Sequence, residues 1–468
     1  MKRAVIRTIK TIGCLVVLLL MAHSMLLVAS GLSLRRAQSR LQEAGRPMSP
    51  EEIVRPTVTP ARNAAPFYEA AFALLRADSP DGEDGEEALF NRLGLAASSF
   101  WREPNSGENR RNLEALLSHE FVPQALHWVE AAVARPACNF HLPYSQGLEM
   151  LNPHINNLIL LQRILMANAL MEAEEGHAEN AWNYVEQSVR LGDALRDELT
   201  LLNLLVRVAL YTYSFEATRR VSDFAPPDEQ VTKRLAHLIE RAKDMDPYLR
   251  ALDGERLFIG EWSFHFMSMQ WFQEKFRFRG GSSDPGFGER MKLRLQRVVH
   301  AYRPLRQLDH ALFLDRWLDL TSTFEEPDWE WLSQFGNRAL PGRSDLPWYS
   351  VMSRLLLPEQ DGLLSQMARF RADARVVRVG LAAKSYKELH GAYPDDLGQL
   401  VPEFLDPMPL DPFTGQELIY RRENGGFVLY SLGENRTDNG GTPQTDENRE
   451  SGEFDIVWRA SATSGQRP

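Results

Sequence analysis

An acidic loop near the C-terminus carries the residues whose types and spacing best suit chemistry. Only two basic residues, Arg436 and Arg449, lie between Gly433 and Asp455. The seven carboxylates of this loop are Glu434, Asp438, Asp446, Glu447, Glu450, Glu453 and Asp455. Hard oxygen donors on a flexible acidic loop suit Ca²⁺, and a bound cation would relieve the repulsion between them. The loop is therefore either a calcium site or a solvated connection.

Catalytic motifs are not found elsewhere in the sequence. The chain has no HExxH, GxSxG or Walker A pattern, and no GxGxxG follows an expected strand. His141 and His154 flank Tyr144 and Glu149, and this loose cluster is the best candidate for a hydrolytic site. Because two prolines separate the histidines, their spacing predicts no particular geometry, and we interpret both as surface or capping residues.

Composition excludes some classes of partner. The net charge of -10 argues against nucleic acid, because phosphate binding needs a basic surface. The two cysteines, Cys14 and Cys138, are not expected to pair, and no Cys/His spacing suggests zinc. One segment is locally basic, and it is either a solvated helix face or a contact for anionic lipid or an acidic partner. Its residues are Lys275, Arg277, Arg279, Arg290, Lys292, Arg294, Arg297, Arg303 and Arg306.

An N-terminal segment predicts a membrane anchor. Residues 11–32 carry no formal charge, and as a helix they would span roughly 33 Å, enough to cross a bilayer core. Lys2, Arg3, Arg7 and Lys10 precede this segment, which favours a cytoplasmic N-terminus and places the rest of the chain outside the cytoplasm. We expect a single-pass protein of the inner (cytoplasmic) membrane. A signal peptide cleaved near Val28-Ala29-Ser30 is the alternative.

The chain from 35 to 365 is expected to form a helical body. Apolar residues recur at helical spacing over 155–175, 178–195 and 199–218, and Gly176 is placed to end the first of these helices. These segments are either tetratricopeptide-like hairpins or part of an ordinary bundle. The aromatic loop with Trp329, Trp331 and Trp348 is interpreted as packing onto the body.

The C-terminal residues 366–460 predict a small α+β module with its own core. Residues 370–390 form an amphipathic helix ended by Gly391, and a short second helix begins near Tyr393, with Asp395 close to its N-terminus. Strands are expected at 417–421, 427–431 and 454–458, the first two joined by a tight turn at 423–426. The predicted fold class is mainly α, with an N-terminal transmembrane helix, a body of helical hairpins, this three-stranded antiparallel sheet and a disordered tail at 461–468.

Two resemblances extend this prediction. The segments 386–394, 410–415 and 429–433, with Asp455-Ile456, resemble the globular domain of the major pseudopilin of type II secretion. In that family the corresponding loop binds calcium, so the resemblance implies ligands at the Leu432 carbonyl, Asn435 and Asp455, to which we add Asp438 and Asp446 from the loop. The body, through segments such as 138–144 and 252–256, resembles uncharacterised bacterial membrane-anchored proteins, and this brings no known activity.

The N-terminus departs from the pseudopilin pattern. Gly13 is followed by Cys14 where that family has Phe, Leu18 stands where it has Glu, and over 300 residues separate the anchor from the module. We therefore expect a non-enzymatic extracytoplasmic scaffold or interaction protein with an unknown protein partner. An accessory component of a type II secretion-like apparatus and a hydrolase with a site in the helical body are the alternatives.

Overall fold

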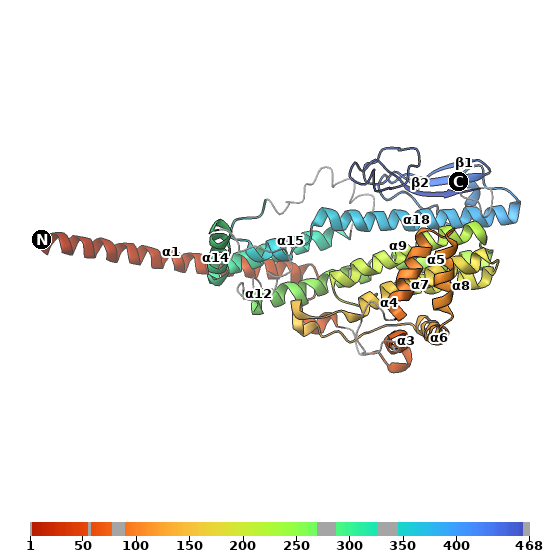
Figure 1. The fold of residues 1–468 in the computed structure, drawn as a ribbon. Helices are drawn as coiled ribbons and strands as arrows, with labels where there is room; N and C mark the ends of the chain where they lie inside the picture. The colour runs from red at the N-terminus through yellow and green to blue at the C-terminus, as the bar shows by residue number, and fades with distance from the viewer. Residues whose placement is uncertain (1, 55–57, 77–88, 269–286, 326–344, 462–468) are drawn as a thin grey trace.

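The computed structural model describes residues 2–54, 58–76, 89–268, 287–325 and 345–461 (Figure 1). The chain is mainly helical, begins with a long apolar helix and ends with a three-stranded antiparallel sheet, which confirms the predicted fold class. Lys275, Arg277, Arg279, Trp329, Trp331 and the tail at 462–468 lie outside the described residues. Cys14 and Cys138 are both free, as expected.

The N-terminal helix α1 (Lys2–Glu43) is long and apolar enough to cross a membrane, and no other helix in the described ranges meets that criterion. Residues 7–25 are exposed and project from the body, whereas the second half of α1 packs along α15 (Arg303–Thr323) (Figure 1). The two helices run parallel, because Ser30 Oγ donates to Gln307 Oε1 at 2.9 Å and Arg40 pairs with Asp315 further along. The helix α14 (Phe287–Ala301) crosses their line.

The body begins with short helical elements that pack around a core of their own. Tyr68, Phe90, Leu93 and Phe100 are among the large buried residues of this core, to which α7 also contributes. The elements are α2 (Pro50–Ile53), η1 (Pro60–Arg62), α3 (Ala65–Arg76), α4 (Leu89–Arg102), α5 (Gly107–Leu117), α6 (Phe121–Val133) and η2 (Tyr144–Glu149).

Three long helices then form the regular part of the body. They are α7 (Pro153–Glu174), α8 (Ala178–Asp193) and α9 (Leu201–Phe224), close to the predicted bounds. Gly176 adopts a φ of 83°, a conformation that favours glycine, and it ends α7 as predicted. The apolar residues Trp182, Val185 and Val189 are buried along one face of α8, so the helical spacing read from the sequence is the packing face.

The remaining helices connect this region to the C-terminal sheet. They are α10 (Glu229–Ala242), α11 (Asp246–Gly254), the π-helical turn η3 (Glu255–Glu261), α12 (Trp262–Phe266), α17 (Val351–Leu356) and α18 (Gln360–His390). The predicted boundary at 365/366 falls inside α18, which begins six residues earlier and ends at Gly391 as expected. No observation decides whether 366–460 folds alone, so the domain division stays a prediction.

The helix α18 contacts the body on one side and the sheet on the other (Figure 1). Toward the body, Phe370 stacks on Tyr211 and Phe215 of α9, with ring centroids 5.8 Å apart in both pairs. Toward the sheet, Gly380 has no side chain and lies directly against the Trp458 ring, where an added Cβ would come within 2.1 Å of it. One continuous apolar core therefore joins the body and the sheet through α18.

The sheet has the predicted meander. Its strands are β1 (Ile419–Glu423), β2 (Gly426–Ser431) and β3 (Ile456–Ala460), in the order β1-β2-β3 and antiparallel throughout. The turn at Asn424-Gly425 has positive φ at both residues, as a two-residue hairpin of this twist requires. The short second helix is a 3₁₀ turn, η6 (Leu397–Leu400), which Asp396 caps, and Asp395 lies next to this cap.

Candidate functional site

Asp455, the predicted calcium ligand nearest the sheet, is a buried acceptor for the loop backbone. Its carboxylate accepts hydrogen bonds from the N–H groups of Gly441 at 2.8 Å, Thr442 at 3.3 Å and Asn439 at 3.4 Å. Burial raises the pKa of Asp455, and these N–H groups oppose that rise by stabilising the charged form. Asp455 therefore fixes the path of residues 439–442 across the sheet.

The other predicted ligands lie in the same loop and have partners of their own. Asp438 Oδ1 accepts from Tyr430 Oη at 2.9 Å and from the N–H of Gly440 at 2.8 Å. Asn435 Oδ1 accepts from the N–H of Thr437 at 2.9 Å. The Leu432 N–H donates to Asp411 Oδ2 at 3.0 Å, and Asp446 is exposed beside Arg449.

The loop thus gathers Asn435, Asp438 and Asp455, but their oxygens already accept hydrogen bonds that a calcium ion would displace. In the described ranges, no group of three or more His, Cys, Asp and Glu side chains is placed to hold a metal ion. These donors therefore fit Ca²⁺ poorly as they stand, and calcium binding stays a prediction.

Asp455→Ala should lower the free energy of unfolding by about 1–3 kcal/mol, because three backbone N–H groups, among them the buried N–H of Gly441, lose their acceptor. Asp446→Ala is the control in the same loop, since its exposed ion pair with Arg449 contributes about 0–1 kcal/mol. Denaturant unfolding of the detergent-solubilised chain measures both. If calcium binds here, millimolar calcium raises the melting temperature of the unaltered chain and not of Asp455→Ala; equal melting in calcium and in chelator contradicts the calcium prediction.

The two histidines of the loose cluster have different environments. His154 is buried, stacks on Phe140 with centroids 4.3 Å apart, and lies with Nε2 3.1 Å from Asn203 Oδ1. The surface or capping interpretation is therefore wrong for His154, because α7 packs its first turn inward, whereas His141 is exposed. Burial lowers the pKa of His154, and neither histidine lines the cleft described below.

The tyrosine of the same cluster binds a residue that the sequence did not single out. Tyr144 donates its hydroxyl hydrogen bond to the buried Glu198. Burial raises the pKa of Glu198 to about 7, although the hydrogen bonds from Tyr144 and from the N–H of Phe140 oppose the rise. Glu149 is exposed. Of the four clustered residues, His154 and Tyr144 are therefore held by separate partners, Asn203 and Glu198, while His141 and Glu149 are exposed.

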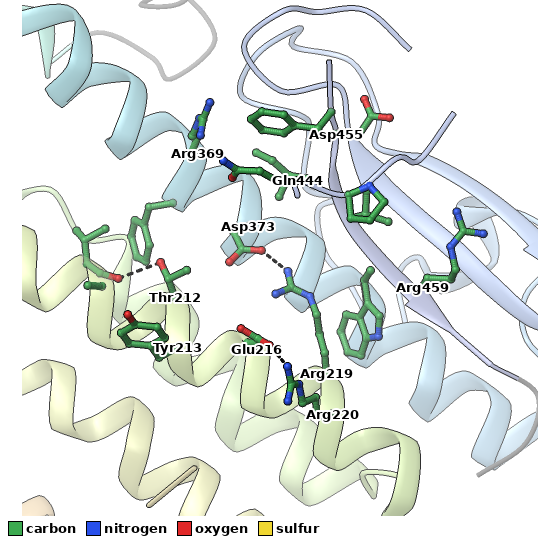
Figure 2. Close-up of a pocket in the computed structure, with 18 of the residues that line it drawn as sticks. Thr212, Tyr213, Glu216, Arg219, Arg220, Arg369, Asp373, Gln444, Asp455 and Arg459 are labelled. Carbon is green, nitrogen blue, oxygen red and sulfur yellow. Dashed lines mark hydrogen bonds and ion pairs between the residues drawn. The ribbon is translucent and has the colours of Figure 1, made fainter. Parts of the chain in front are cut away.

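A cleft of about 970 Å³ lies where the body meets the sheet (Figure 2). The second half of α9 and the middle of α18 form one side, and β3 with the preceding loop forms the other. Within the cleft, Arg219 of α9 pairs with Asp373 of α18, and the Arg219 guanidinium lies 6.0 Å from the Trp458 ring. This ion pair joins α9 to α18, and its two residues are 154 positions apart in the chain.

Charges of both signs surround the cleft. Arg220 pairs with Glu216 at 2.6 Å on α9, Arg369 of α18 pairs with Glu434 at 3.1 Å, and Arg459 of β3 is exposed. Tyr213 is also exposed and lies beside Glu216 in the cleft (Figure 2). This lining can accept a polar main chain with mixed side chains, and it favours neither a strongly acidic nor a strongly basic ligand.

The outer edge of β3 opens into this cleft. The residues that flank the Asn424–Gly425 turn form a hydrogen-bonded pair, and bonding directions alternate along an antiparallel ladder. Leu429 of β2 is therefore hydrogen-bonded to Trp458, and Val457 and Arg459 turn their N–H and C=O groups away from β2. The first outward N–H of this edge, at Asp455, donates to the Thr442 carbonyl at 2.7 Å. In the part of the chain that the structure describes, no group bonds the outward backbone atoms of Val457 and Arg459.

The sequence did not single out this edge or the residues beneath it. A meander of three consecutive strands makes the third strand an edge, so the edge itself could have been inferred from the order of the strands. The Arg219–Asp373 pair could not, because neither helix carries a signal for its partner. The cleft therefore depends on how α9, α18 and β3 come together.

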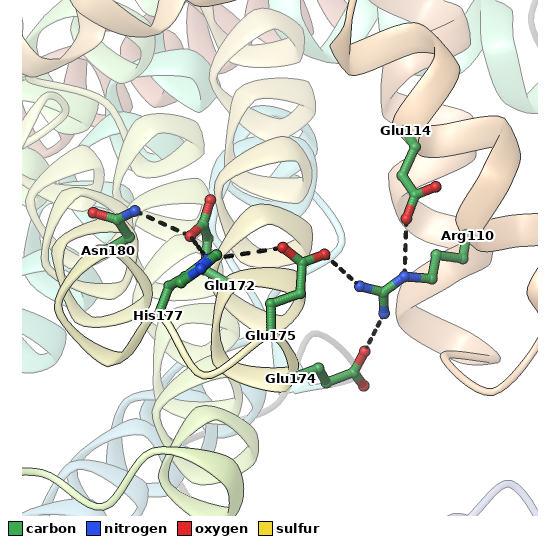
Figure 3. Close-up of polar contacts among 7 residues, drawn as sticks. All are labelled: Arg110, Glu114, Glu172, Glu174, Glu175, His177 and Asn180. Carbon is green, nitrogen blue, oxygen red and sulfur yellow. Dashed lines mark hydrogen bonds and ion pairs between the residues drawn. The ribbon is translucent and has the colours of Figure 1, made fainter.

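A second polar cluster lies at the turn between α7 and α8 (Figure 3). Arg110 of α5 contacts Glu114 at 2.9 Å, Glu174 at 2.6 Å and Glu175 at 2.7 Å. His177 Nδ1 lies 3.0 Å from Glu172 beside it. These side chains are partly exposed and pair with one another, so the cluster ties α5 to the α7–α8 turn.

Comparison with protein-family models, curated proteins and solved structures finds no match to this chain. The resemblance of residues 366–460 to the pseudopilin domain and that of the body to membrane-anchored proteins therefore stay predictions. The cleft at the β3 edge is the candidate functional site.

Proposed function

We propose that this chain is a membrane-anchored interaction protein that binds an extended segment of a partner protein in the cleft beside β3. The observation that carries the proposal is the open backbone edge at Val457 and Arg459. An extended peptide can add a strand to such an edge, where main-chain hydrogen bonds supply affinity and flanking pockets supply specificity.

The surroundings of the edge support a peptide ligand. Trp458 is buried against Gly380, so β3 is held in place by the core and the edge is preorganised for pairing. Tyr213 offers an exposed contact to side chains of the added strand. Edges of this kind favour unwanted pairing unless they are covered, and here α9 and α18 line the cleft beside the edge.

The proposal places this cleft outside the cytoplasm. According to this proposal, α1 crosses the inner membrane once, with Arg7 and Lys10 on the cytoplasmic side of the apolar span. The α1–α15 contact then holds the body close to the membrane. A partner would be bound near the membrane surface, as expected of a scaffold.

Val457→Pro tests the edge directly. Proline removes an outward N–H but no bond to β2, so the sheet should remain folded while binding of an added strand weakens by at least about tenfold. The probe is a displayed library of random twelve-residue peptides, selected on the full chain in lipid nanodiscs. Arg422→Pro is the matched control, because Arg422 occupies the equivalent outward position on the opposite edge, in β1.

The selected peptides should bind the unaltered chain and Arg422→Pro equally and lose affinity for Val457→Pro. In hydrogen exchange, the amides of Val457 and Arg459 should become protected when a peptide is added. Equal binding to both proline variants would overturn the proposal. So would a selection in which no peptide is enriched over the background without the chain.

A further inference from the structure

The helix α14 crosses the line of α1 at the end of the body from which the exposed part of α1 projects (Figure 1). The contact is direct, because the Tyr302 hydroxyl, one residue after α14, lies 2.6 Å from His23 Nδ1 of α1. On its inner side α14 packs on the body through Val299 and His300, and His300 Nε2 lies 3.2 Å from the Met267 carbonyl. The position of α14 along α1 is therefore fixed by packing.

This position coincides with the end of the free apolar span. Residues 7–25 of α1 are exposed, and His23 near the end of this stretch contacts Tyr302, whereas Ser30 is buried against α15. The uncharged part of this stretch, residues 11–25, spans about 22 Å as a helix, and the long side chains of Lys10 and Arg7 can extend to the cytoplasmic headgroups. If residues 11–25 lie in the bilayer core, the opposite membrane surface lies at the level of His23 and Tyr302.

The side of α14 away from the body is apolar. Met291, Leu295 and Val298 are 50%, 58% and 65% exposed, and their spacing of four and three residues places them on one face of the helix. Three large exposed apolar residues in a row mark a contact surface in a soluble region of a protein. Nothing in the described ranges covers this face.

The same segment is strongly basic. The helix α14 carries Arg290, Lys292, Arg294 and Arg297 against one acidic residue, Glu289. Arg303 and Arg306 follow at the start of α15. This contrasts with the chain as a whole, whose net charge is -10. An apolar face combined with Lys and Arg on the same short helix is the pattern of helices that lie in the membrane interface.

Two exposed aromatic residues lie near α14. Phe266 is 75% exposed and adjoins Met267, whose carbonyl contacts His300 of α14. Trp348 is 69% exposed and precedes α17, which contacts α14. Trp, with an apolar ring and a polar N–H, favours the headgroup level of a membrane, and an exposed Phe near the same helix adds apolar surface there.

We propose that α14 lies flat in the interface of the same membrane that α1 crosses, with Met291, Leu295 and Val298 among the acyl chains and its Lys and Arg side chains on anionic lipid phosphates. This inference rests on α1 crossing the membrane, which is part of the proposed function. The bilayer is the occupant that the structure favours, because the apolar face adjoins the end of the apolar span of α1. The helix would then fix the tilt of the body, and with it the orientation of the cleft, relative to the membrane.

Spin labels on the full chain test this placement. With Cys14→Ser and Cys138→Ala as background, single cysteines are introduced as Leu295→Cys, Leu18→Cys in α1 and Leu389→Cys on the exposed face of α18. The chain is reconstituted in phosphatidylcholine vesicles with about one third phosphatidylglycerol, an anionic lipid. Collision rates with oxygen, which enters lipid, and with a water-soluble nickel chelate are then compared.

The label at 295 should show an oxygen-to-nickel ratio several-fold above that at 389 and below that at 18. Adding Lys292→Glu and Arg294→Glu should lower the ratio at 295 toward that at 389, and omitting phosphatidylglycerol should have a smaller effect in the same direction. A ratio at 295 equal to that at 389, with 18 still in lipid, would overturn the α14 placement and leave the anchor intact. Water exposure at 18 would instead overturn the anchor, and the proposed function with it.

Discussion

Replacing Phe370 with alanine is expected to lower the free energy of unfolding by about 3–5 kcal/mol, the usual cost of removing a buried phenyl ring. Phe370 is almost fully buried in α18. Its ring stacks on Tyr211 and Phe215 of α9, and Tyr248 of α11 is 6.3 Å away. The substitution therefore opens a cavity in the core shared by α9, α11 and α18.

The measurement is denaturant unfolding of the full chain in detergent. Phe266→Ala is the matched control, because the same ring is removed from an exposed position, where the change should stay within about 0.5 kcal/mol. Equal losses in both variants would contradict the buried role of Phe370.

The same variant tests the division of the chain. Because α18 belongs to the core of the body and to that of the sheet, amides of α9 and of β2 should lose hydrogen-exchange protection together in Phe370→Ala. If β2 keeps its protection while α9 loses it, residues 366–460 form an independent unit, as the sequence predicts.

Replacing Arg256 with alanine is expected to cost about 3–5 kcal/mol, because it leaves buried carboxylates without their cation. The Arg256 side chain is fully buried in η3, with Nε 3.8 Å from Asp253 Oδ1 and Nη1 3.5 Å from Glu261 Oε1. It also donates to the Pro47 carbonyl, just beyond the end of α1. The side chain thus joins the anchor helix to the body.

The neighbouring groups make this loss large. Asp253 also faces Arg46 at 3.6 Å, and Glu261 also faces His310 of α15 at 2.8 Å. Burial raises the pKa of Asp253, while Arg256 and Arg46 oppose the rise by favouring the charged form. Without Arg256, Asp253 must either take up a proton or remain charged beside Arg46 alone.

The control is Arg449→Ala, which removes an arginine from an ion pair of 3.0 Å with Asp446 on the surface. That pair is screened by water, so the expected change is about 0–1 kcal/mol. Thermal or denaturant unfolding of both variants at neutral pH gives the comparison. In Arg256→Ala the loss should shrink as the pH falls toward the raised pKa of Asp253, since protonation removes the uncompensated charge. A loss of stability in Arg256→Ala that does not change with pH, or that is no larger than in the control, would contradict the role given to Arg256 as the cation of these buried carboxylates.

The sequence by itself determined the elements with strong local signals. The uncharged run in α1, the helical spacing of Trp182, Val185 and Val189, and the Asn424-Gly425 turn each depend on residues close together in the chain. Hydrophobic periodicity and turn chemistry therefore predicted α7, α8 and the hairpin within two residues of their bounds, and α9 with an end six residues too early. The pseudopilin resemblance, and not these local signals, singled out Asn435 and Asp455, and Asp438 was added because it lies in the same loop.

Only the tertiary structure decided what these elements do together. Arg219 meets Asp373 from 154 residues away, and Arg256 reaches the Pro47 carbonyl 209 residues back. The sequence also gave no reason to expect that the start of α18 would extend into the body. Such contacts are decided by which faces bury the most apolar surface at once, and a buried charge finds its partner only when that packing is complete. The sequence shows that a residue is charged or that a helix has an apolar face, but not what either one contacts. The cleft at the β3 edge exists only where α9, α18 and β3 meet.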